Sequence, residues 1–553
     1  MKDLQNFNFR IIKMKQIFKK FKYLILGVIC CGLIVACNNA TTVNEVTTTP
    51  TGNGRVSFGT TLRARTLDPA DSYDLAGMNL IYNVAETLYT YDVGTTDLVP
   101  LLATEMPTIS DDGLVYTIPL REGVIFHDGT DFNAEAMEFS LNRFMENGGR
   151  PSFLLTDIIE EVTPTAEYEL QITLQQPFAA FPALLAFPGA CAVSPANYTI
   201  GQGEFQPNEL VATGPYRLSS FDSDSARLDV FEDYWGDMPD NEGIDMQIFA
   251  DNSANLYNSF ITGALDVAYQ SFAPEQTVSL LEDAEAGSFQ ALQGQGTVIA
   301  YMSLNRNQPP LDQLEVRQAI ALIMNRELIM ERVTQGLAEP LYSMIPSAFD
   351  VYQPVFEQMY RDDNAELAKE LLTQAGFSEE NPAQIEIWFP STSRPRTAVA
   401  NTLRAIAEQQ LDGMIEFEPQ GVESATAFSN LSQGTYQTFL GDWYPDFLDP
   451  DNYVHPFLSC PDGNPEDGCI EGGAQNQGSF FYNERVNELI NNARRTNDPN
   501  ERAEDYREIQ EILGQEVPYI PIWQTKEYAF AQNGVDGVAI NPSQTFPFWT
   551  ISN

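Results

Sequence analysis

The chain has 553 residues, of which 43% are apolar and 19% charged, so it has the composition of a folded protein and is too long for one ordinary core. It carries 30 basic and 77 acidic residues, a formal net charge of −47 at pH 7. This imbalance argues strongly against nucleic-acid binding, which depends on lysine and arginine contacts to phosphates. It leaves open whether the acidity attracts cationic ligands or reflects a salty habitat.

The first 37 residues have the features of a lipoprotein signal. Lysines precede an apolar run from Tyr23 to Ala36 that is short for a membrane span and typical of a signal peptide. Because the run ends in Leu-Ile-Val-Ala-Cys, we expect cleavage before Cys37 and a lipid on this cysteine; the alternative is an uncleaved anchor. A start at Met14 gives a more typical signal length. The polar segment 38–54 is expected to be a flexible tether.

Predicted strands and helices alternate from Arg55 onwards. RVSFGTTL predicts a strand, LDPADSYD a loop, and the following segment a helix that ends near Thr90. Tyr116, Ile118 and Leu120 alternate as in a half-buried strand. The N-terminal part of the chain therefore mixes both kinds of element.

The helix predicted to begin at Ala134 has clear boundaries. Asn133 is suited to cap it, and Gly148 follows its last turn. His127 lies in the preceding turn, FHDG, and is interpreted as a packing or turn residue and not as a ligand. Further on, ATGPYRL from Ala212 predicts a tight turn into another strand.

The second half of the chain contains further strand, loop and helix units. After Tyr301, MSLN predicts a strand and NQPPLDQL a loop before a helix with an apolar face. Another unit starts at Trp388, with Arg394 in its loop. The helix predicted after Asp498 ends at Gly514, and VPYIPIWQ predicts a last strand.

The segment from Asp442 to Phe457, DWYPDFLDPDNYVHPF, combines acids with aromatic rings. Its prolines exclude a regular helix, so we expect a stiff loop that leaves the strand YQTFLGDW. Binding groups concentrate on loops held by a rigid scaffold. The segment is interpreted either as a ligand-facing loop or as a solvated acidic turn whose aromatics fill the core.

The sequence offers little for catalysis. It has no G-x-S-x-G and no H-E-x-x-H, and two histidines, His127 and His455, make a Ser-His-Asp arrangement barely possible. Paired carboxylates such as Asp446 and Asp449 keep a secreted hydrolase open as an alternative. Zinc-site spacing is absent, and no metal or cofactor is expected.

Three cysteines follow Cys37. In an exported protein, Cys460 and Cys469 are candidates for a small disulfide loop around PDGNPEDG. Cys191 is expected to be a buried thiol.

These motifs occur in the order found in bacterial extracellular solute-binding proteins of family 5, the peptide-binding lipoproteins of ABC importers. The segments that carry the resemblance are FHDG before the helix at Ala134, ATGPYR, the strand and helix after Tyr301, Arg394-Pro395, and WYPDFLDPDN. The chain resembles the family from about Arg55 to its C-terminus. One departure is Ala212, where the family usually has glycine.

The resemblance implies an α/β fold of the type II periplasmic-binding-protein class, with two lobes joined by hinge strands and an extra subdomain in the larger lobe. Lobe I is then expected to comprise residues 55–299 and 524–553, with the extra subdomain at about 92–205. Lobe II is expected to comprise residues 300–523.

The resemblance also implies the ligand contacts. In peptide-binding members, the acid that corresponds to Asp446 holds the α-ammonium of the ligand. Trp443 and Tyr444 are then expected to wall the cleft, and Asn305 lies at a strand end that is rich in asparagine in the family.

An Arg-Pro pair in dipeptide-binding relatives reads the ligand carboxylate, a role that falls on Arg394 or on nearby Arg396. If Arg394 does so, the ligand is a dipeptide or tripeptide; otherwise longer peptides fit. The choice between the two arginines stays open.

The function implied is capture of short peptides without chemistry and their delivery to a membrane permease with ATPase subunits. We expect a monomer, lipid-anchored outside the cytoplasmic membrane and bound to no nucleic acid. Other members of the family bind nickel chelates, haem, oligosaccharides or opines, and His455 keeps a nickel chelate open. A sensory role without transport is also open.

Overall fold

One mixed sheet runs through the described part of the chain, residues 54–270 and 272–553 of the computed structural model. Its strand order is β15-β14-β16-β12-β19-β11-β1-β10-β9-β8, and β13 also pairs with β19. The strands are β1 Val56–Thr60, β8 Tyr216–Phe221, β9 Ser225–Val230, β10 Gly243–Ile248, β11 Val267–Tyr269, β12 Gln290–Leu304, β13 Ala338–Pro340, β14 Ala383–Pro390, β15 Ile415–Val422, β16 Thr438–Trp443 and β19 Tyr519–Ala531. The predicted signal, Cys37 and almost all of the tether lie outside the described residues.

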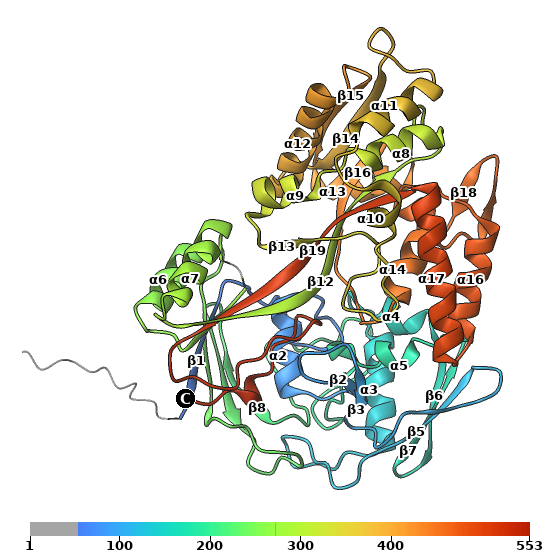
Figure 1. Ribbon diagram of the computed structural model, residues 1–553. Helices are drawn as coiled ribbons and strands as arrows, with labels where there is room; N and C mark the ends of the chain where they lie inside the picture. The colour runs from blue at the N-terminus through green and yellow to red at the C-terminus, as the bar shows by residue number, and fades with distance from the viewer. Residues whose placement is uncertain (1–53, 271) are drawn as a thin grey trace, which may run out of the picture. The chain divides into compact units, whose positions relative to one another are not determined.

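Two long antiparallel strands, β12 and β19, lie at the centre of this sheet. They pair from Gln290 opposite Ala531 to Ser303 opposite Tyr519, with a register shift after Gln295. β19 joins the half that contains β11 and β1, and β12 joins the half that contains β16 and β14. Figure 1 shows both strands running from one half to the other. They confirm the strands predicted at MSLN and VPYIPIWQ, although both are longer than expected.

A second, four-stranded sheet has the order β4-β5-β7-β6. Its strands are β4 Thr108–Ile109, β5 Val115–Pro119, β6 Ile159–Ala166 and β7 Glu169–Leu174. Helix α3 (Ala134–Glu146) packs on it, and the two bury a core that includes Phe126, Met137 and Phe181. The strand predicted at 116–120 is confirmed. So is the cap of α3, because the Asn133 side chain accepts a hydrogen bond from the backbone N–H of Ala136.

Two short hairpins and the remaining helices complete the structure. The hairpins pair β2 (Tyr89–Tyr91) with β3 (Leu98–Pro100), and β17 (Asp462–Asn464) with β18 (Gly468–Glu471). The helices are α2 Leu75–Val84, α4 Phe153–Thr156, α5 Phe181–Leu184, α6 Ser253–Ile261, α7 Pro274–Glu285, α8 Leu314–Leu322, α9 Arg326–Ile329, α10 Val355–Tyr360, α11 Ala365–Gln374, α12 Arg394–Gln410, α13 Ser424–Ser432, α14 Asp451–Leu458, α15 Gly473–Asn476, α16 Glu484–Arg495 and α17 Pro499–Glu516.

Two predicted helix ends are wrong. Helix α2 stops at Val84, because the chain becomes extended at Ala85, and Thr90 belongs to β2. Helix α17 continues past Gly514 to Glu516 and ends where Val517 adopts a left-handed conformation with φ of 49°. Both helices therefore end where the next residue leaves the helical conformation. Neither ends at the residue that the sequence predicted, Thr90 or Gly514.

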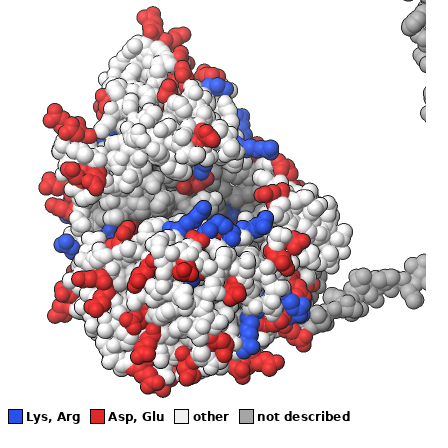
Figure 2. All heavy atoms as spheres, turned by 180° about the vertical axis from the view of Figure 1, so that it is seen from behind, with Lys and Arg blue, Asp and Glu red and all other residues white. Residues whose placement is uncertain are grey.

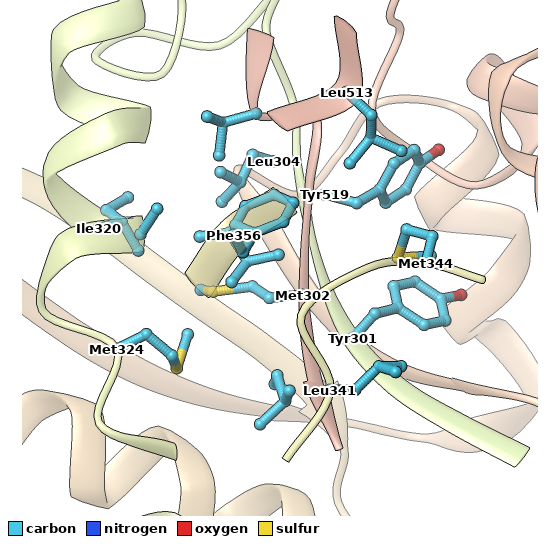
Figure 3. Packing of buried hydrophobic residues seen from close by; sticks show 14 of the residues in the cluster. Tyr301, Met302, Leu304, Ile320, Met324, Leu341, Met344, Phe356, Leu513 and Tyr519 are labelled. Carbon is cyan, nitrogen blue, oxygen red and sulfur yellow. The ribbon is translucent and has the colours of Figure 1, made fainter. Parts of the chain in front are cut away.

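The largest core packs around β12 and β19, and Figure 3 shows part of it. The side chains labelled there are Tyr301, Met302, Leu304, Ile320, Met324, Leu341, Met344, Phe356, Leu513 and Tyr519. They come from both long strands, from α8, α10 and α17, and from the loops between them. The apolar face predicted for the helix after Tyr301 is therefore buried against the strand that precedes it.

The described part of the chain contains one disulfide and one cysteine with a free thiol. Cys460 and Cys469 form a disulfide beside the β17–β18 hairpin. Cys191 is buried, and its burial raises the pKa of the thiol. In the same residues, no helix is both long enough and apolar enough to span a membrane.

His127 joins two of the motifs that the sequence singled out. Its Nε2 donates to the carbonyl of Gly214 at 2.9 Å, and its Nδ1 accepts from the N–H of Ala212 at 3.3 Å. Both ring nitrogens are therefore used by a neutral imidazole. Burial lowers the pKa of His127 to about 4. The interpretation as a packing residue is confirmed.

Candidate functional site

A cavity of about 380 Å³ lies where the acidic segment meets the N-terminal end of α2. Its walls come from distant parts of the sequence, which lie in both predicted lobes. The lining residues are Tyr73, Asp74, Leu75, Met78, Asn79, Tyr82, Thr90, Tyr91, Ala186, Phe187, Pro188, Tyr444, Pro445, Asp446, Phe447, Leu448, Ser543, Gln544 and Thr545. We call it the first cavity.

The acidic segment reaches this cavity as a short loop between β16 and α14. Helix α14 spans Asp451–Leu458, so the expectation that the prolines exclude a helix is wrong. Pro450 sits before the first turn, where no backbone donor is needed, and Pro456 removes only one bond from a two-turn helix. A residue outside the loop holds it in place, because the N–H of Leu448 donates a hydrogen bond to the Tyr91 hydroxyl at 2.8 Å.

Three of the four acids in this segment have an arginine partner. Asp449 receives two hydrogen bonds from Arg502, at 2.8 and 2.5 Å. Asp451 lies 3.5 Å from Arg494, and its burial raises the pKa of the carboxyl to about 6.

The third paired acid is Asp442, which forms an ion pair with Arg396. Burial raises the pKa of Asp442, and the arginine opposes that shift. These three carboxylates therefore already have their charge matched within the protein.

Asp446 is the acid without an arginine among the described residues. It lines the first cavity, and its Oδ1 accepts a hydrogen bond from the Tyr73 hydroxyl at 2.5 Å. Burial raises the pKa of its carboxyl, opposed only by this hydrogen bond. A half-buried carboxylate with a neutral donor and no cation has the environment that a cationic group of a ligand would complete.

The two aromatic residues that were predicted to wall the cleft, Trp443 and Tyr444, lie in different places. Tyr444 lines the first cavity and is 56% exposed. Trp443 does not line it; its Nε1 donates to Asn452 at 2.9 Å and its ring packs edge-on against Phe457. Trp443 therefore holds α14 in place, while Tyr444 faces the cavity.

The two arginines that were candidates for binding the ligand carboxylate, Arg394 and Arg396, also lie in different environments. Arg394 is exposed at the first position of α12, not in the loop before it. Arg396, one half-turn further, is engaged with Asp442. Neither lines the first cavity.

The structure places Asn305 outside the lining of the first cavity. It is 1% exposed, and its side-chain nitrogen donates to the carbonyls of Gly434 and Tyr436. Its oxygen accepts from the N–H of Asn307. This geometry braces the loop that follows β12.

Several lining residues had no signal in the sequence. Tyr73 lies in the loop before α2 and packs edge-on against Phe153, with 6.0 Å between ring centres. Gln544 lies close to the C-terminus and donates to Glu527 of β19 at 2.9 Å. Only the turn pattern LDPADSYD marked the neighbourhood of Tyr73, and it does not indicate what the tyrosine faces.

The described residues contain no group of three or more metal-ligating side chains. His455 lies in α14 and does not line the first cavity, and burial lowers its pKa to about 3. The cavity thus offers the carboxylates of Asp446 and Asp74, together with hydroxyls, amides and aromatic faces, which is the chemistry of noncovalent capture.

Comparison with known proteins gives a consistent result. The middle region of the bacterial extracellular solute-binding proteins, family 5, matches residues 97–465. Glutathione-binding protein GsiB of Escherichia coli O1:K1 is 28% identical over 493 residues, which cover 87% of this chain and 91% of that protein.

Solved structures share the fold. HbpA2 from Haemophilus parasuis superposes with a TM-score of 0.77 at 24% identity, over 90% of this chain and 99% of that chain. A dipeptide binding protein from Pseudoalteromonas sp. SM9913, in complex with Met-Leu, gives a TM-score of 0.69 at 22% identity, over 90% and 99%. The α/β fold with two lobes that the sequence predicted is confirmed.

Proposed function

Because the chain belongs to the bacterial extracellular solute-binding proteins of family 5, we propose that it captures short peptides between its lobes for an ABC importer. The observation that carries this proposal is Asp446, a carboxylate that lines the first cavity and has no arginine partner among the described residues. Relatives support the ligand class: one is named for binding glutathione, and another was solved with Met-Leu.

In the proposed complex, the α-ammonium of the peptide pairs with Asp446. The Tyr73 hydroxyl already donates a hydrogen bond to this carboxylate. Both residues line the first cavity, so this bond holds the carboxylate in place at the cavity wall. Tyr444 and Phe187 offer apolar faces for the first side chains of the peptide. Bonds to the peptide backbone are expected from the amide and hydroxyl groups of Gln544 and Thr545.

The carboxyl end of the peptide needs a positive environment. Figure 2 shows a hollow across one face of the molecule, where basic side chains gather while acidic ones spread over the rest of that face. Of the two candidate arginines, Arg394 is the better candidate for the carboxylate, because Arg396 is engaged with Asp442.

We further propose that residues 55–299 and 524–553 form lobe I and residues 300–523 lobe II. The register shift in β12 after Gln295 is a suitable hinge, because it interrupts the ladder between the two long strands. The loaded protein would then dock on a membrane permease. Transport by that permease would be powered by ATPase subunits.

The proposed attachment to the membrane is a lipid on Cys37 after removal of the signal. Mass spectrometry of the protein purified from bacterial membranes tests it directly. We expect an acylated N-terminal Cys37 with the preceding residues missing. An unprocessed N-terminus would contradict the lipoprotein assignment.

The central test is the variant Asp446→Asn. It keeps the size of the side chain and removes the charge, so peptide affinity should fall at least about 30-fold, or roughly 2 kcal/mol. Calorimetric titration of trialanine into residues 52–553, which form one compact unit, measures this effect. An N-acetylated trialanine should bind the unaltered protein as weakly as trialanine binds the variant.

A matched control is Asp111→Asn, which removes the same charge from an exposed turn. It should leave the affinity unchanged. If Asp446→Asn binds free and acetylated peptides as the unaltered protein does, Asp446 does not hold the ammonium.

A further inference from the structure

A second cavity, of about 510 Å³, adjoins the first. The two share Tyr82, Thr90, Tyr91, Ala186 and Pro188 in their walls. They are therefore neighbouring cavities with part of their lining in common. A ligand anchored at Asp446 in the first cavity is therefore close to the second cavity.

Two residues of the shared lining are fixed by hydrogen bonds. The Tyr91 hydroxyl donates to the carbonyl of Ala183 at 3.3 Å and accepts from Leu448. The Tyr82 hydroxyl accepts from Asn541 at 3.1 Å. The second cavity is thus a built feature of the fold and not a gap between mobile side chains.

Glu86 is the buried charged group of the second cavity. It is 3% exposed, and its two oxygens accept from the Tyr234 hydroxyl at 2.8 Å and from the Trp235 Nε1 at 2.9 Å. The described residues supply no ion pair to it; the Arg121 guanidinium packs on the Trp235 ring, 4.3 Å from its centre. Burial raises the pKa of Glu86 to about 7, opposed by its hydrogen bonds and by the positive charge of nearby Arg121. Each carboxylate oxygen retains a lone pair for a further donor.

The rest of the lining of the second cavity also includes acidic and aromatic side chains. Asp92 and Asp237 are exposed at the rim, and Trp549 adds an aromatic face. No lysine, arginine or histidine of the described residues lines the cavity. Carboxylates combined with aromatic faces favour a cation with an aliphatic stem, since the ring faces attract positive charge and the stem gains apolar contact.

We propose that the second cavity is a subsite for a basic side chain, a lysine ammonium or an arginine guanidinium, of the bound peptide. This inference rests on the proposed peptide-binding function and adds a preference within it. A basic side chain downstream of the peptide N-terminus would reach the second cavity and place its charge near Glu86, Asp92 and Asp237, which line it. Neutral residues of equal length would fill the space without matching the charge.

The test compares tripeptides that differ only in one charge. Ala-Lys-Ala and Ala-Ala-Lys are titrated calorimetrically beside their norleucine counterparts, which have the same aliphatic stem without the ammonium. We expect the lysine peptide at one of the two positions to bind about tenfold tighter than its norleucine match, because a partly desolvated cation gains from contact with aromatic faces and carboxylates.

Three variants locate the preference. Glu86→Gln removes the buried charge, and the double variant Asp92→Asn/Asp237→Asn removes the rim charges without touching a buried residue. Either should reduce the lysine advantage to about threefold or less, an amount expected for one exposed pair. Asp97→Asn, on the same β2–β3 turn but outside the lining, should keep the full advantage.

The outcomes separate this inference from the function it rests on. Tripeptides that bind through Asp446 with equal affinity for lysine and norleucine overturn the subsite alone. A lysine advantage that survives both Glu86→Gln and the rim variant also overturns it. If no tripeptide binds, trialanine included, the proposed function and the subsite fail together.

Discussion

Several buried charges of the described residues have an oppositely charged partner, whereas the buried carboxylates of Glu86 and Glu527 receive hydrogen bonds only from neutral groups. Arg143 and Asp68 form two hydrogen bonds, at 2.8 and 2.7 Å, and both are almost fully buried. Asp446 and Glu86 instead receive only neutral donors. An unpaired charge out of water costs several kcal/mol, so both positions are places where a ligand cation would lower the free energy of the complex.

His127 should make stability depend on pH between about 4 and 6.5. Its pKa is lowered to about 4 in the folded chain, so the unfolded chain binds a proton more readily over this interval. The stability that neutral His127 contributes is fully present above the unfolded pKa and is lost as pH falls toward 4. His127→Gln should be about 1–2 kcal/mol less stable than the unaltered protein at pH 7.5, and this difference should shrink and then reverse in sign as pH falls to 4.

Urea unfolding of both proteins at a series of pH values provides the measurement. The comparison is needed because raised carboxyl pKa values, such as that of Asp451, act in the opposite direction over the same interval. A difference between the two proteins that stays constant from pH 7.5 to 4 would refute the assignment.

At the scale of elements, α14 is held by paired charges from two neighbouring helices. Arg502 belongs to α17 and Arg494 to α16, and they face Asp449 and Asp451 at the start of α14. These contacts fix the end of the loop that carries Asp446. The position of the candidate ligand acid thus depends on helices about fifty residues further along the chain.

Arg502→Ala should destabilise the protein by about 3–5 kcal/mol, because it leaves Asp449 buried without a partner. Arg485→Ala is a matched control: Arg485 pairs with Glu508, and both are more than 40% exposed. That substitution should cost much less, because water and salt screen a pair of exposed charges. Urea unfolding measures both, and equal costs would show that the buried pair contributes no more than the surface pair.

Elements with a local signal were predictable, and those that depend on distant partners were not. Asn133 caps α3 as expected, because capping needs only residues within one turn. The first half of β12 was missed, since its residues before Gly296 alternate between half-buried and exposed positions with little apolar contrast. The lining of the first cavity was missed because it depends on distant partners: Tyr73 and Gln544 meet Asp446 only in the folded chain.

At the scale of the whole molecule, the net charge of −47 opposes compaction. Salt shortens the screening length from about 30 Å at 0.01 M to about 3 Å at 1 M, so the melting temperature should rise over this range of NaCl at pH 7. Near the sequence pI of about 4.1 the rise should be largely absent. Thermal unfolding at both pH values measures it, and an equal rise at both would exclude self-repulsion as its cause.

The buried Cys191 also makes the protein convenient to label. After Cys37, the only other cysteines are Cys460 and Cys469, which are joined to each other. A single new cysteine in place of exposed Tyr444 or Arg394 would therefore be the one accessible thiol of residues 54–270 and 272–553. A fluorophore at position 444 would report ligand-dependent changes at the first cavity, and one at position 394 would report changes at the start of α12, without removal of a native cysteine.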